Sequence, residues 1–467
     1  MLPLRTMKPA LPKGTRDFGP LETARRRYIF ETIRSQFELF GYQALETPAM
    51  ENLTTLTGKY GDEGDRLIFK ILNSGDFLQE VREKHASLDA PSAVLPLISE
   101  KALRYDLTVP FARFVVMNRD KLAFPFKRYQ MQPVWRADRP QKGRYREFWQ
   151  CDADVVGSAS LLNEAELIQI YDRVFHQLGL PVNILLNNRK ILSGMAEVAG
   201  VPEQLTELTV ALDKLDKIGW EKVVEEMQQK GIPENALKTI EPITHLAGSN
   251  TEKLQQLEHL LQGSEIGLTG IHELRELLSF FSPEGKLELL DASLELDLSL
   301  ARGLNYYTGT ILEVKARNIA FGSIGGGGRY DDLTGIFGLA GVPGVGISFG
   351  ADRIYDILLD QNLFPASQTT GTRILIASLE LSERNDGLLL LQTLRNRGIA
   401  AEIFPEPAKL RKQFEYAEKK GIPYLALYGP DEVKSGVVNL KKLSSGKQVN
   451  VPLESLGKID SFFEEGS

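Results

Sequence analysis

Apolar and polar positions recur with two different periods along the chain, and these periods predict where helices and strands lie. Apolar residues return every three or four positions over residues 22–40 and again over residues 161–179, which predicts two amphipathic helices. Residues 42–50 predict a short strand that ends at Pro48, because proline cannot donate to the middle of a ladder. Residues 72–100 are interrupted by glycine and proline, so we expect a long irregular excursion there.

A pair of strands with polar faces is predicted on either side of a basic loop. The loop is residues 139–146, with the sequence RPQKGRYR, and it separates two segments of strand character. Two-residue alternation gives the first strand a face with Arg128, Gln130, Gln132 and Arg136, and the second strand a face with Phe148, Gln150, Asp152 and Asp154. Faces that carry both arginine and aspartate predict the floor of a polar cleft.

The remaining sequence predicts a large domain followed by a small one. Residues 200–290 are rich in Leu, Glu, Lys and Gln with helical periodicity, so we expect a helical insertion within a domain that covers residues 1–360. A strand of small residues runs into a helix that begins near Ala351, and residues 361–371 have the composition of a linker. The strand–helix rhythm beyond it predicts a small α/β domain with a mainly parallel sheet over residues 372–467.

Composition and charge limit the class of protein. The 467 residues are 42% hydrophobic and 25% charged, which is typical of globular rather than disordered chains. The formal net charge of −7 excludes a surface that is basic overall, so a polyanion would have to bind to a local patch. Cys151 is the only cysteine, which excludes an internal disulfide and a four-cysteine zinc site and favours the cytoplasm. We find no apolar run of signal-peptide or membrane-helix length and expect a soluble protein.

The glycine run within GSIGGGGRYDDL, residues 322–333, leaves two alternatives open. It lacks the Lys-Ser/Thr pair that completes a Walker phosphate loop. Glycines here either allow close approach of neighbouring strands or provide a floor without side chains for a flat ligand. The five histidines show no metal-ligand spacing, so no metal ligands are predicted from them.

Three arginines are candidates for binding phosphate. Arg136, Arg302 and Arg353 each stand beside a predicted strand, Arg302 within ARGLNYYTG and Arg353 at the start of a helix. A lone arginine is most often a solvated or ion-paired surface residue. Three on neighbouring strand-associated elements favour a substrate that carries phosphoryl groups, because guanidinium binds phosphate oxygens bidentately.

Two carboxylates and two tyrosines are candidates for binding the rest of a substrate. Asp106 and Asp154 either cap a strand end or pair with a neighbouring arginine, or else they contact a ligand. Tyr306 and Tyr307 are adjacent, so on a strand they point to opposite faces and at most one packs where the other binds.

With these residues and motifs, the chain resembles the histidyl-tRNA synthetases, a family of class II aminoacyl-tRNA synthetases, over nearly its whole length. The first helix and the strand ending at Pro48 are similar to class II motif 1, residues 126–157 to motif 2, and GVGISFGADRIYDIL to motif 3. LRYDLTVPFARF, residues 103–114, and ARGLNYYTG, residues 301–309, resemble the histidine-specific segments. The resemblance implies an α+β catalytic domain with an antiparallel sheet and a helical insertion, plus a C-terminal α/β anticodon-binding domain.

The same resemblance implies roles for individual residues. The catalytic arginines would be Arg302 on the α-phosphate and the substrate carboxylate, Arg136 on the α-phosphate, and Arg353 on the γ-phosphate. The α-amino group of histidine would meet Asp106, Thr108 and Gln150, and its imidazole would meet Asp154 and Tyr307, with Tyr306 in the same segment. ATP would also contact Glu147, Gly326 and Gly328. Transfer RNA would be approached by Arg139, Lys142 and Arg144 of the basic loop and by Lys409, Arg411 and Lys412 of the small domain.

The activity implied by the resemblance has two steps. Histidine and ATP give histidyl-adenylate and pyrophosphate, and histidine is then transferred to the 3'-terminal ribose of tRNA(His). Mg²⁺ would accompany ATP, with protein ligands that the resemblance does not name, and motif 1 would form a homodimer interface. The alternative is the regulatory subunit of ATP phosphoribosyltransferase in histidine biosynthesis, which shares the catalytic architecture. The three arginines in intact motifs and the C-terminal domain favour the synthetase.

Overall fold

The chain forms two compact units, and each is considered by itself. The computed structural model describes residues 8–58, 61–301, 307–365, 371–377, 384–458 and 461. The first unit is Met1–Arg16 with Ile29–Leu363, and the second is Asp17–Tyr28 with Phe364–Ser467, so the boundary falls inside α1 (Pro20–Leu39). The domain limits at residues 360 and 372 that composition suggests stay predictions.

The first unit is built on an eight-stranded sheet with the order β1-β5-β6-β11-β10-β9-β7-β8. Its strands are β1 (Gln43–Ala44), β5 (Phe126–Trp135), β6 (Glu147–Val156), β7 (Val182–Asn188), β8 (Ser293–Leu296), β9 (Thr310–Ala316), β10 (Gly325–Arg329) and β11 (Gly344–Gly350). The outer pairs β1–β5 and β7–β8 are parallel, and the neighbours between them are antiparallel. This confirms the predicted antiparallel catalytic sheet, including the β5–β6 hairpin around the basic loop.

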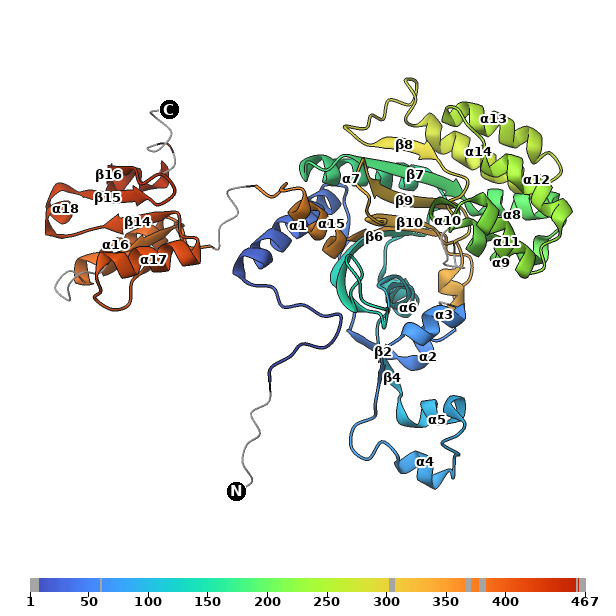
Figure 1. Cartoon of the computed structure of the whole chain (residues 1–467), viewed down its shortest axis with the longest axis horizontal. Helices are drawn as coiled ribbons and strands as arrows, with labels where there is room; N and C mark the ends of the chain where they lie inside the picture. The colour runs from blue at the N-terminus through green and yellow to red at the C-terminus, as the bar shows by residue number, and fades with distance from the viewer. Residues whose placement is uncertain are drawn as a thin grey trace. The chain divides into compact units, whose positions relative to one another are not determined.

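The two faces of the sheet differ because side chains alternate along each strand. On β11, Phe349 packs against helices on one face, with ring centroids 4.7 Å from Tyr171 of α7 (Leu162–Gln177) and 5.8 Å from Phe37 of α1. Its neighbour Ser348 belongs to the opposite face and lines a cavity. Figure 1 shows the curved β5–β6 hairpin around α6 (Thr108–Asn118), whose Phe111 is completely buried.

The segment between the first helix and α6 differs from the prediction in two places. The strand expected over residues 42–50 is only β1, because the chain leaves the main sheet after Ala44 and β2 (Met50–Asn52) joins a second sheet. That sheet has the order β2-β4-β3, with β3 (Lys70–Ile71) and β4 (Lys101–Leu103). The excursion expected to be irregular contains two short helices, α4 (Gln79–Glu83) and α5 (Pro91–Ile98). Proline begins α5, where its missing N–H costs nothing.

Helices occupy most of the stretch from residue 189 to residue 279. They are α8 (Arg189–Val198), η2 (Pro202–Gln204), α9 (Leu205–Leu212), α10 (Leu215–Ile218), α11 (Trp220–Gln229), α12 (Glu234–Thr244), α13 (Asn250–Leu260) and α14 (Glu265–Ser279). Helices α8 and α14 cross where two glycines meet, since a Cβ on Gly194 would lie 2.5 Å from the Cα of Gly267. The remaining elements of the first unit are α2 (Leu53–Leu56), α3 (Gly61–Leu67), η1 (Arg119–Lys121), η3 (Leu333–Phe337) and α15 (Ala351–Asp360).

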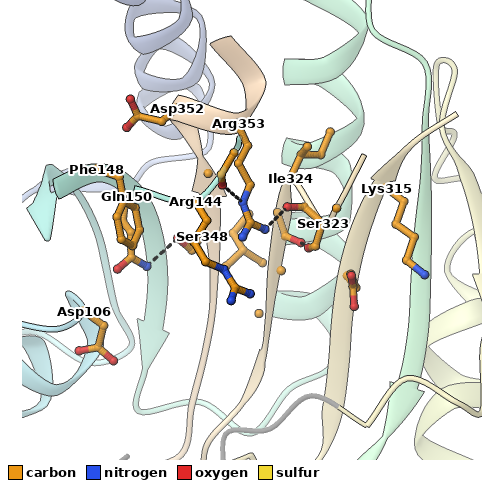
Figure 2. A pocket seen from close by; sticks show the side chains of 18 of the residues that line it. Asp106, Arg144, Phe148, Gln150, Lys315, Ser323, Ile324, Ser348, Asp352 and Arg353 are labelled. Carbon is orange, nitrogen blue, oxygen red and sulfur yellow. Dashed lines mark hydrogen bonds between the residues drawn. The ribbon is translucent and has the colours of Figure 1, made fainter. Parts of the chain in front are cut away.

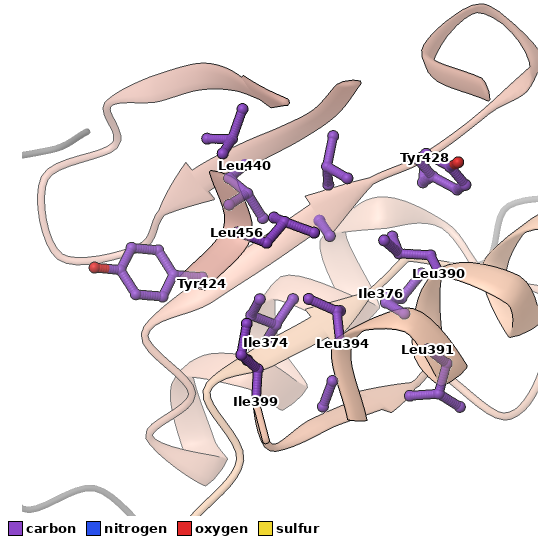
Figure 3. Packing of buried hydrophobic residues seen from close by; sticks show 14 residues of the cluster. Ile374, Ile376, Leu390, Leu391, Leu394, Ile399, Tyr424, Tyr428, Leu440 and Leu456 are labelled. Atoms are coloured by element: carbon purple, nitrogen blue, oxygen red, sulfur yellow. The ribbon is translucent and has the colours of Figure 1, made fainter. Parts of the chain in front are cut away.

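The second unit contains a five-stranded sheet with the order β13-β12-β14-β15-β16. Its elements are β12 (Ile374–Ile376), α16 (Arg384–Asn396), β13 (Ala401–Ile403), α17 (Leu410–Lys420), β14 (Tyr424–Leu427), α18 (Pro430–Ser435), β15 (Val437–Lys442), β16 (Gln448–Pro452) and η5 (Leu453–Lys458). Strands β13, β12 and β14 are parallel as expected, but β15 and β16 add an antiparallel hairpin. Figure 3 shows the core, in which Ile374 and Ile376 pack with Leu394 of α16 and Leu440 of β15.

Candidate active site

A cavity of about 990 Å³ opens on the face of the main sheet that carries the polar side chains. The predicted site residues that line it are Asp106, Thr108, Arg136, Lys142, Arg144, Gln150, Asp154, Tyr307, Gly326 and Arg353. Three other predicted residues, Glu147, Gly328 and Arg139, are not among the lining residues. Arg302 and Tyr306 lie outside the described residues. Figure 2 shows the cavity from close by.

The floor of the cavity is polar because β6 and β11 lie side by side in register. Gln150 is opposite Gly350, Asp152 opposite Ser348 and Asp154 opposite Gly346. The Gln150 amide Nε2 donates to the Ser348 hydroxyl at 3.0 Å, as the dashed line in Figure 2 marks. The Gln150 Oε1 is buried without a hydrogen-bond partner among the described residues. An acceptor of this kind is available to a substrate N–H.

Asp152 is a buried acid within this floor. Its side chain is almost completely buried, and Oδ1 has no hydrogen-bond partner in the described part of the chain. Burial raises the pKa of Asp152 to about 7, and the positive charge of Arg128 opposes that rise. The Asp154 charge and, more weakly, the Asp106 charge act in the same direction as burial. Asp152 therefore keeps its proton to a higher pH than an ordinary aspartate does.

Asp154 is held from two sides. Its Oδ2 lies 2.8 Å from Nη2 of Arg128, and both side chains are buried. Its Oδ1 accepts a hydrogen bond from the Tyr330 hydroxyl. Burial raises the pKa of Asp154, whereas Arg128 and the Tyr330 hydrogen bond lower it. Gly346 makes room for the carboxylate, because a Cβ there would lie 2.0 Å from Oδ1.

Asp106 and Thr108 lie where the chain enters α6. Asp106 is buried, and its Oδ1 accepts a hydrogen bond at 3.2 Å from the N–H of Val109 in the first turn of the helix. The residue therefore caps the helix and lines the cavity at the same time. The hydrogen bond is to a helix rather than to the strand end expected, and contact of Asp106 with a ligand stays a prediction.

Arg136 follows β5 and is oriented by the cavity wall. Its Nε donates to the carbonyl oxygen of Tyr105 at 3.0 Å. The guanidinium lies 4.2 Å from the ring centroid of Tyr105 and 5.2 Å from that of Phe148. The two nearby aromatic rings restrict the guanidinium, which places a positive charge in the cavity.

Arg353 lies in the first turn of α15, directly after β11. Its Nε donates to the carbonyl oxygen of Gly143 at 2.8 Å and its Nη1 to that of Ser323 at 2.6 Å, as Figure 2 shows. These bonds join the basic loop to the segment before β10. A positive charge at a helix N-terminus gains nothing from the helix dipole, so the carbonyl oxygens are what stabilise it here.

Arg16, which sequence analysis missed, contacts both the helix that carries Arg353 and the basic loop that Arg353 binds. Arg16 pairs with Asp352 at 2.6 Å and with Asp356 at 3.0 Å, both on α15. Its guanidinium carbon also lies 3.5 Å from the ring centroid of Tyr145 in the basic loop. Asp352 in turn accepts the backbone N–H of Trp149 at 2.8 Å. Sequence alone could not indicate these contacts, because Arg16 is far along the chain from both α15 and the basic loop.

The glycine run is expected either to allow close approach of strands or to form a floor without side chains, and individual glycines differ in which they do. A Cβ on Gly327 would lie 2.0 Å from the carbonyl oxygen of Gly346, so this glycine allows close approach of two strands. A Cβ on Gly328 would lie 2.8 Å from the ring of Tyr307, so Gly328 makes room for that tyrosine. Gly326 lines the cavity. The assignments of Gly326 and Gly328 to ATP stay predictions.

The basic residues proposed for RNA binding have varied surroundings. Lys142 pairs with Asp360 at 2.5 Å, and Arg144 lies 3.9 Å from Asp138, all with partly or largely exposed side chains. In the second unit, Arg411 is 90% exposed and lies 3.0 Å from Glu415. Lys409 and Lys412 flank it at the start of α17.

Outside the cavity lining, Glu147 accepts a hydrogen bond at 2.8 Å from the indole N–H of Trp135.

Metal-binding clusters and membrane-spanning helices are both absent from the part of the chain that the structure describes. The described residues contain no group of three or more His, Cys, Asp or Glu side chains placed to hold a metal ion. Among the same residues, no helix is long and apolar enough to cross a membrane.

Comparisons with known proteins agree with one another. The family model for histidyl-tRNA synthetase matches residues 99–354, and the model for an anticodon binding domain matches residues 386–459. A histidine–tRNA ligase of Porphyromonas gingivalis is 56% identical over 96% of this chain and 98% of its own length, and one of Phocaeicola vulgatus is 54% identical over the same shares. The crystal structure of histidyl-tRNA synthetase from Nostoc sp. PCC 7120 is 32% identical, with a TM-score of 0.82 over 98% of this chain and 99% of that one.

A solved structure from Bacillus halodurans, described as an ATP phosphoribosyltransferase regulatory subunit/histidyl-tRNA synthetase, is 20% identical with a TM-score of 0.68, over 89% of this chain and 97% of that one. At that identity the likeness shows the fold alone. The antiparallel sheet with its polar cavity is the catalytic fold of a class II aminoacyl-tRNA synthetase. Within that class, the chain belongs to the histidyl-tRNA synthetase family.

Proposed function

We propose that the chain is a histidine–tRNA ligase, which makes histidyl-adenylate and pyrophosphate from histidine and ATP and then esterifies tRNA(His) with histidine. One observation carries the proposal: buried aspartates suited to an ammonium and an imidazole share a cavity with two arginines suited to phosphate. Family membership supplies the same amino acid. The regulatory-subunit alternative has less support, because the similar curated chains are ligases over nearly their full length.

Histidine is proposed to lie along the floor formed by β6 and β11. Asp106 and the amide oxygen of Gln150 are acceptors for its ammonium, with Thr108 beside them. Asp154 and Tyr307 would contact the imidazole, and Tyr306 is proposed in the same role from the resemblance. An imidazole N–H requires an acceptor, which the Asp154 carboxylate supplies.

The arginines are proposed to stabilise charge during the first step. The histidine carboxylate oxygen forms a bond to the α-phosphorus of ATP, and the bond from that phosphorus to the bridging oxygen breaks, so pyrophosphate leaves with its electron pair. Negative charge builds on the α-phosphoryl oxygens, and Arg136 is positioned in the cavity wall before reaction. Arg353 would bind the γ-phosphate, Glu147 would meet ATP, and Arg302 is proposed on the α-phosphate.

Mg²⁺ belongs to the proposal as a companion of ATP. When bound it would neutralise phosphate charge, and most of its ligands would be phosphate oxygens and water, as is usual for this ion. No set of three metal-ligating side chains is found among the described residues, so protein ligands are not assigned. The cytoplasm as location and a homodimer through motif 1 are proposed on the same resemblance.

Transfer RNA is proposed to meet both units. The second unit matches an anticodon binding domain, and the start of α17 presents Lys409, Arg411 and Lys412. Arg139, Lys142 and Arg144 of the basic loop would approach the acceptor end, because mobile positive charge suits phosphate contacts.

The test is histidine-dependent exchange of labelled pyrophosphate into ATP, run beside the other amino acids. We expect exchange with histidine alone, followed by charging of tRNA(His) in a second assay. A folded protein that binds histidine without exchange would instead favour the regulatory function. Exchange driven by a different amino acid would contradict the assignment of Asp154 to imidazole.

A further inference from the structure

We propose that Arg128 is a positioning residue for histidine recognition: it lies behind Asp154 and holds that carboxylate as an oriented anion at the back of the imidazole site. The inference rests on the proposed function, since it concerns how the same cavity selects its amino acid. Arg128 belongs to β5, whereas Asp154 belongs to β6, and the two residues are directly opposite each other in the antiparallel register. Register therefore places the guanidinium and the carboxylate on the same face of the hairpin.

Arg128 is buried in a way that packing alone does not favour. Its exposed fraction is 0%, and its guanidinium carbon lies 4.2 Å from the ring centroid of the buried Phe111. Its only hydrogen bond among the described residues is a long one, 3.4 Å, from Nη2 to the carbonyl oxygen of Leu107. Nε and Nη1 have no hydrogen-bond partner there. A buried arginine with unsatisfied donors is costly, so a neutral residue of similar size would suit the core better.

The Arg128 guanidinium is in direct contact with one carboxylate of the cavity, that of Asp154. Nη2 lies 2.8 Å from Oδ2 of Asp154, and Tyr330 donates to the other carboxylate oxygen. Asp154 is thus held at both oxygens, while it also lines the cavity. This arrangement fixes the direction in which its remaining lone pairs point, and those lone pairs are what a substrate N–H requires.

A second buried arginine shows what a purely structural arginine looks like in this chain. Arg104 donates to the carbonyl oxygens of Thr47, Pro48 and Pro133 and to the side chain of Gln132. It is also almost completely buried, but among the described residues it makes no ion pair, whereas Arg128 pairs with Asp154. The difference is one of direct contact: Arg104 mainly supports backbone carbonyl oxygens, whereas Arg128 contacts a carboxylate of the site.

Removal of Arg128 would leave two carboxylates close together without their cation. The titratable and charged groups that act on Asp154 or its neighbour Asp152 are Arg128, Tyr330 and Asp106, together with Tyr42 for Asp154 and Arg104 for Asp152. Without the guanidinium, Asp154 would retain a proton to higher pH, because burial already favours its neutral form. A protonated carboxyl is a poorer acceptor for imidazole, so histidine would bind less well, and raising the pH would restore binding.

The experiment compares Arg128→Met, Arg128→Lys and the control Arg104→Met. Histidine-dependent pyrophosphate exchange gives KM for histidine, KM for ATP and kcat, and calorimetry gives the Kd of histidine, each from pH 6 to pH 9. For Arg128→Met we expect KM for histidine to rise about 10- to 100-fold at pH 7, on the scale of an uncompensated buried charge, with KM for ATP nearly unchanged. The ratio of variant to wild-type KM should fall as pH rises.

The two other variants separate charge from folding. Arg128→Lys keeps the positive charge, so its KM ratio should be smaller and independent of pH. Arg104→Met should lose stability without a pH-dependent KM ratio. An unchanged KM for histidine in folded Arg128→Met, or the same pH dependence in Arg104→Met or in Arg128→Lys, would overturn the proposal. If Arg128→Met does not fold, KM for histidine in Arg128→Lys decides: a rise with KM for ATP unchanged, absent from Arg104→Met, supports the proposal, and no rise overturns it.

Failure of the proposed function would look different. Wild-type protein that binds histidine without exchange would refute the ligase assignment, and the calorimetric comparison of the variants would still test Arg128. Wild-type exchange with unaltered histidine affinity in the Arg128 variants would refute the positioning role alone. Wild-type protein with neither exchange nor histidine binding would refute both.

Discussion

Gly346→Ala tests directly whether the position of Asp154 determines histidine recognition. A Cβ at Gly346 would lie 2.0 Å from Oδ1 and 2.5 Å from Cγ of Asp154, whereas ordinary van der Waals contact begins at 3.4 Å. The carboxylate oxygen would therefore have to withdraw from 2.0 Å to at least 3.4 Å from that Cβ. Such a shift breaks its contact with Tyr330 or with Arg128. Loss of one hydrogen bond to a charged group costs about 1.5–3 kcal/mol, which corresponds to roughly a 10- to 100-fold change in affinity.

The assay is histidine-dependent pyrophosphate exchange, with KM for histidine as the expected change and KM for ATP as the internal reference. Gly350→Ala is the matched control, since it lies on the same strand and its Cβ would meet only the carbonyl oxygen of Ile324, at 3.4 Å, and side-chain atoms of Arg353 farther away. A folded Gly346→Ala variant with the wild-type KM for histidine would refute the reasoning. It would show that Asp154 is either displaced without consequence or not in contact with substrate.

Three further predictions address acid, phosphate and RNA. Asp152→Asn should stabilise the protein at pH 8 by up to roughly 4 kcal/mol, because folding raises the pKa of this carboxyl from 3.8 to about 7 and the folded protein therefore loses stability as pH rises through that interval. In urea unfolding, the difference in free energy of unfolding between variant and wild type should become smaller towards pH 5. An equal difference at pH 5 and pH 8 would argue against a buried titrating acid. Arg353→Gln should raise KM for ATP more than tenfold in the exchange assay, on the scale of one lost charged donor. Calorimetry should find the Kd of histidine unchanged. Weaker binding of both ATP and histidine would contradict a specific role of Arg353 in phosphate binding. Deletion of residues 371–467 should spare exchange more than tRNA charging, and equal loss of both in a folded truncation would contradict this division.

The sequence predicts the polar floor better than it predicts how the floor is held. Alternation along two strands is enough to place Asp152 and Asp154 on one face, and the structure brings both to the cavity. The pairing of Arg128 with Asp154 depends on the register of the hairpin, which alternation alone does not fix. Tyr330 reaches Asp154 from a segment far along the chain, so no local pattern could indicate it.

The errors in the fold have similar physical causes. The hairpin of β15 and β16 is half exposed and carries lysine and asparagine, so its strands resemble surface loop in composition. Helix α5 contains Pro96 and has a second proline at its start, which weakens the helical signal. In both cases neighbouring elements supply the stability that intrinsic propensity lacks.

The single cysteine has a practical consequence for spectroscopy. Cys151 lies in β6 at the centre of the main sheet, with an exposed fraction of 0%, so reagents reach its sulfur only when the sheet opens. The native protein should therefore give a silent background to maleimide dyes and spin labels. A cysteine introduced at an exposed position would be labelled alone, without removal of any natural thiol. The rate at which Cys151 itself is labelled would then report how often the catalytic sheet opens.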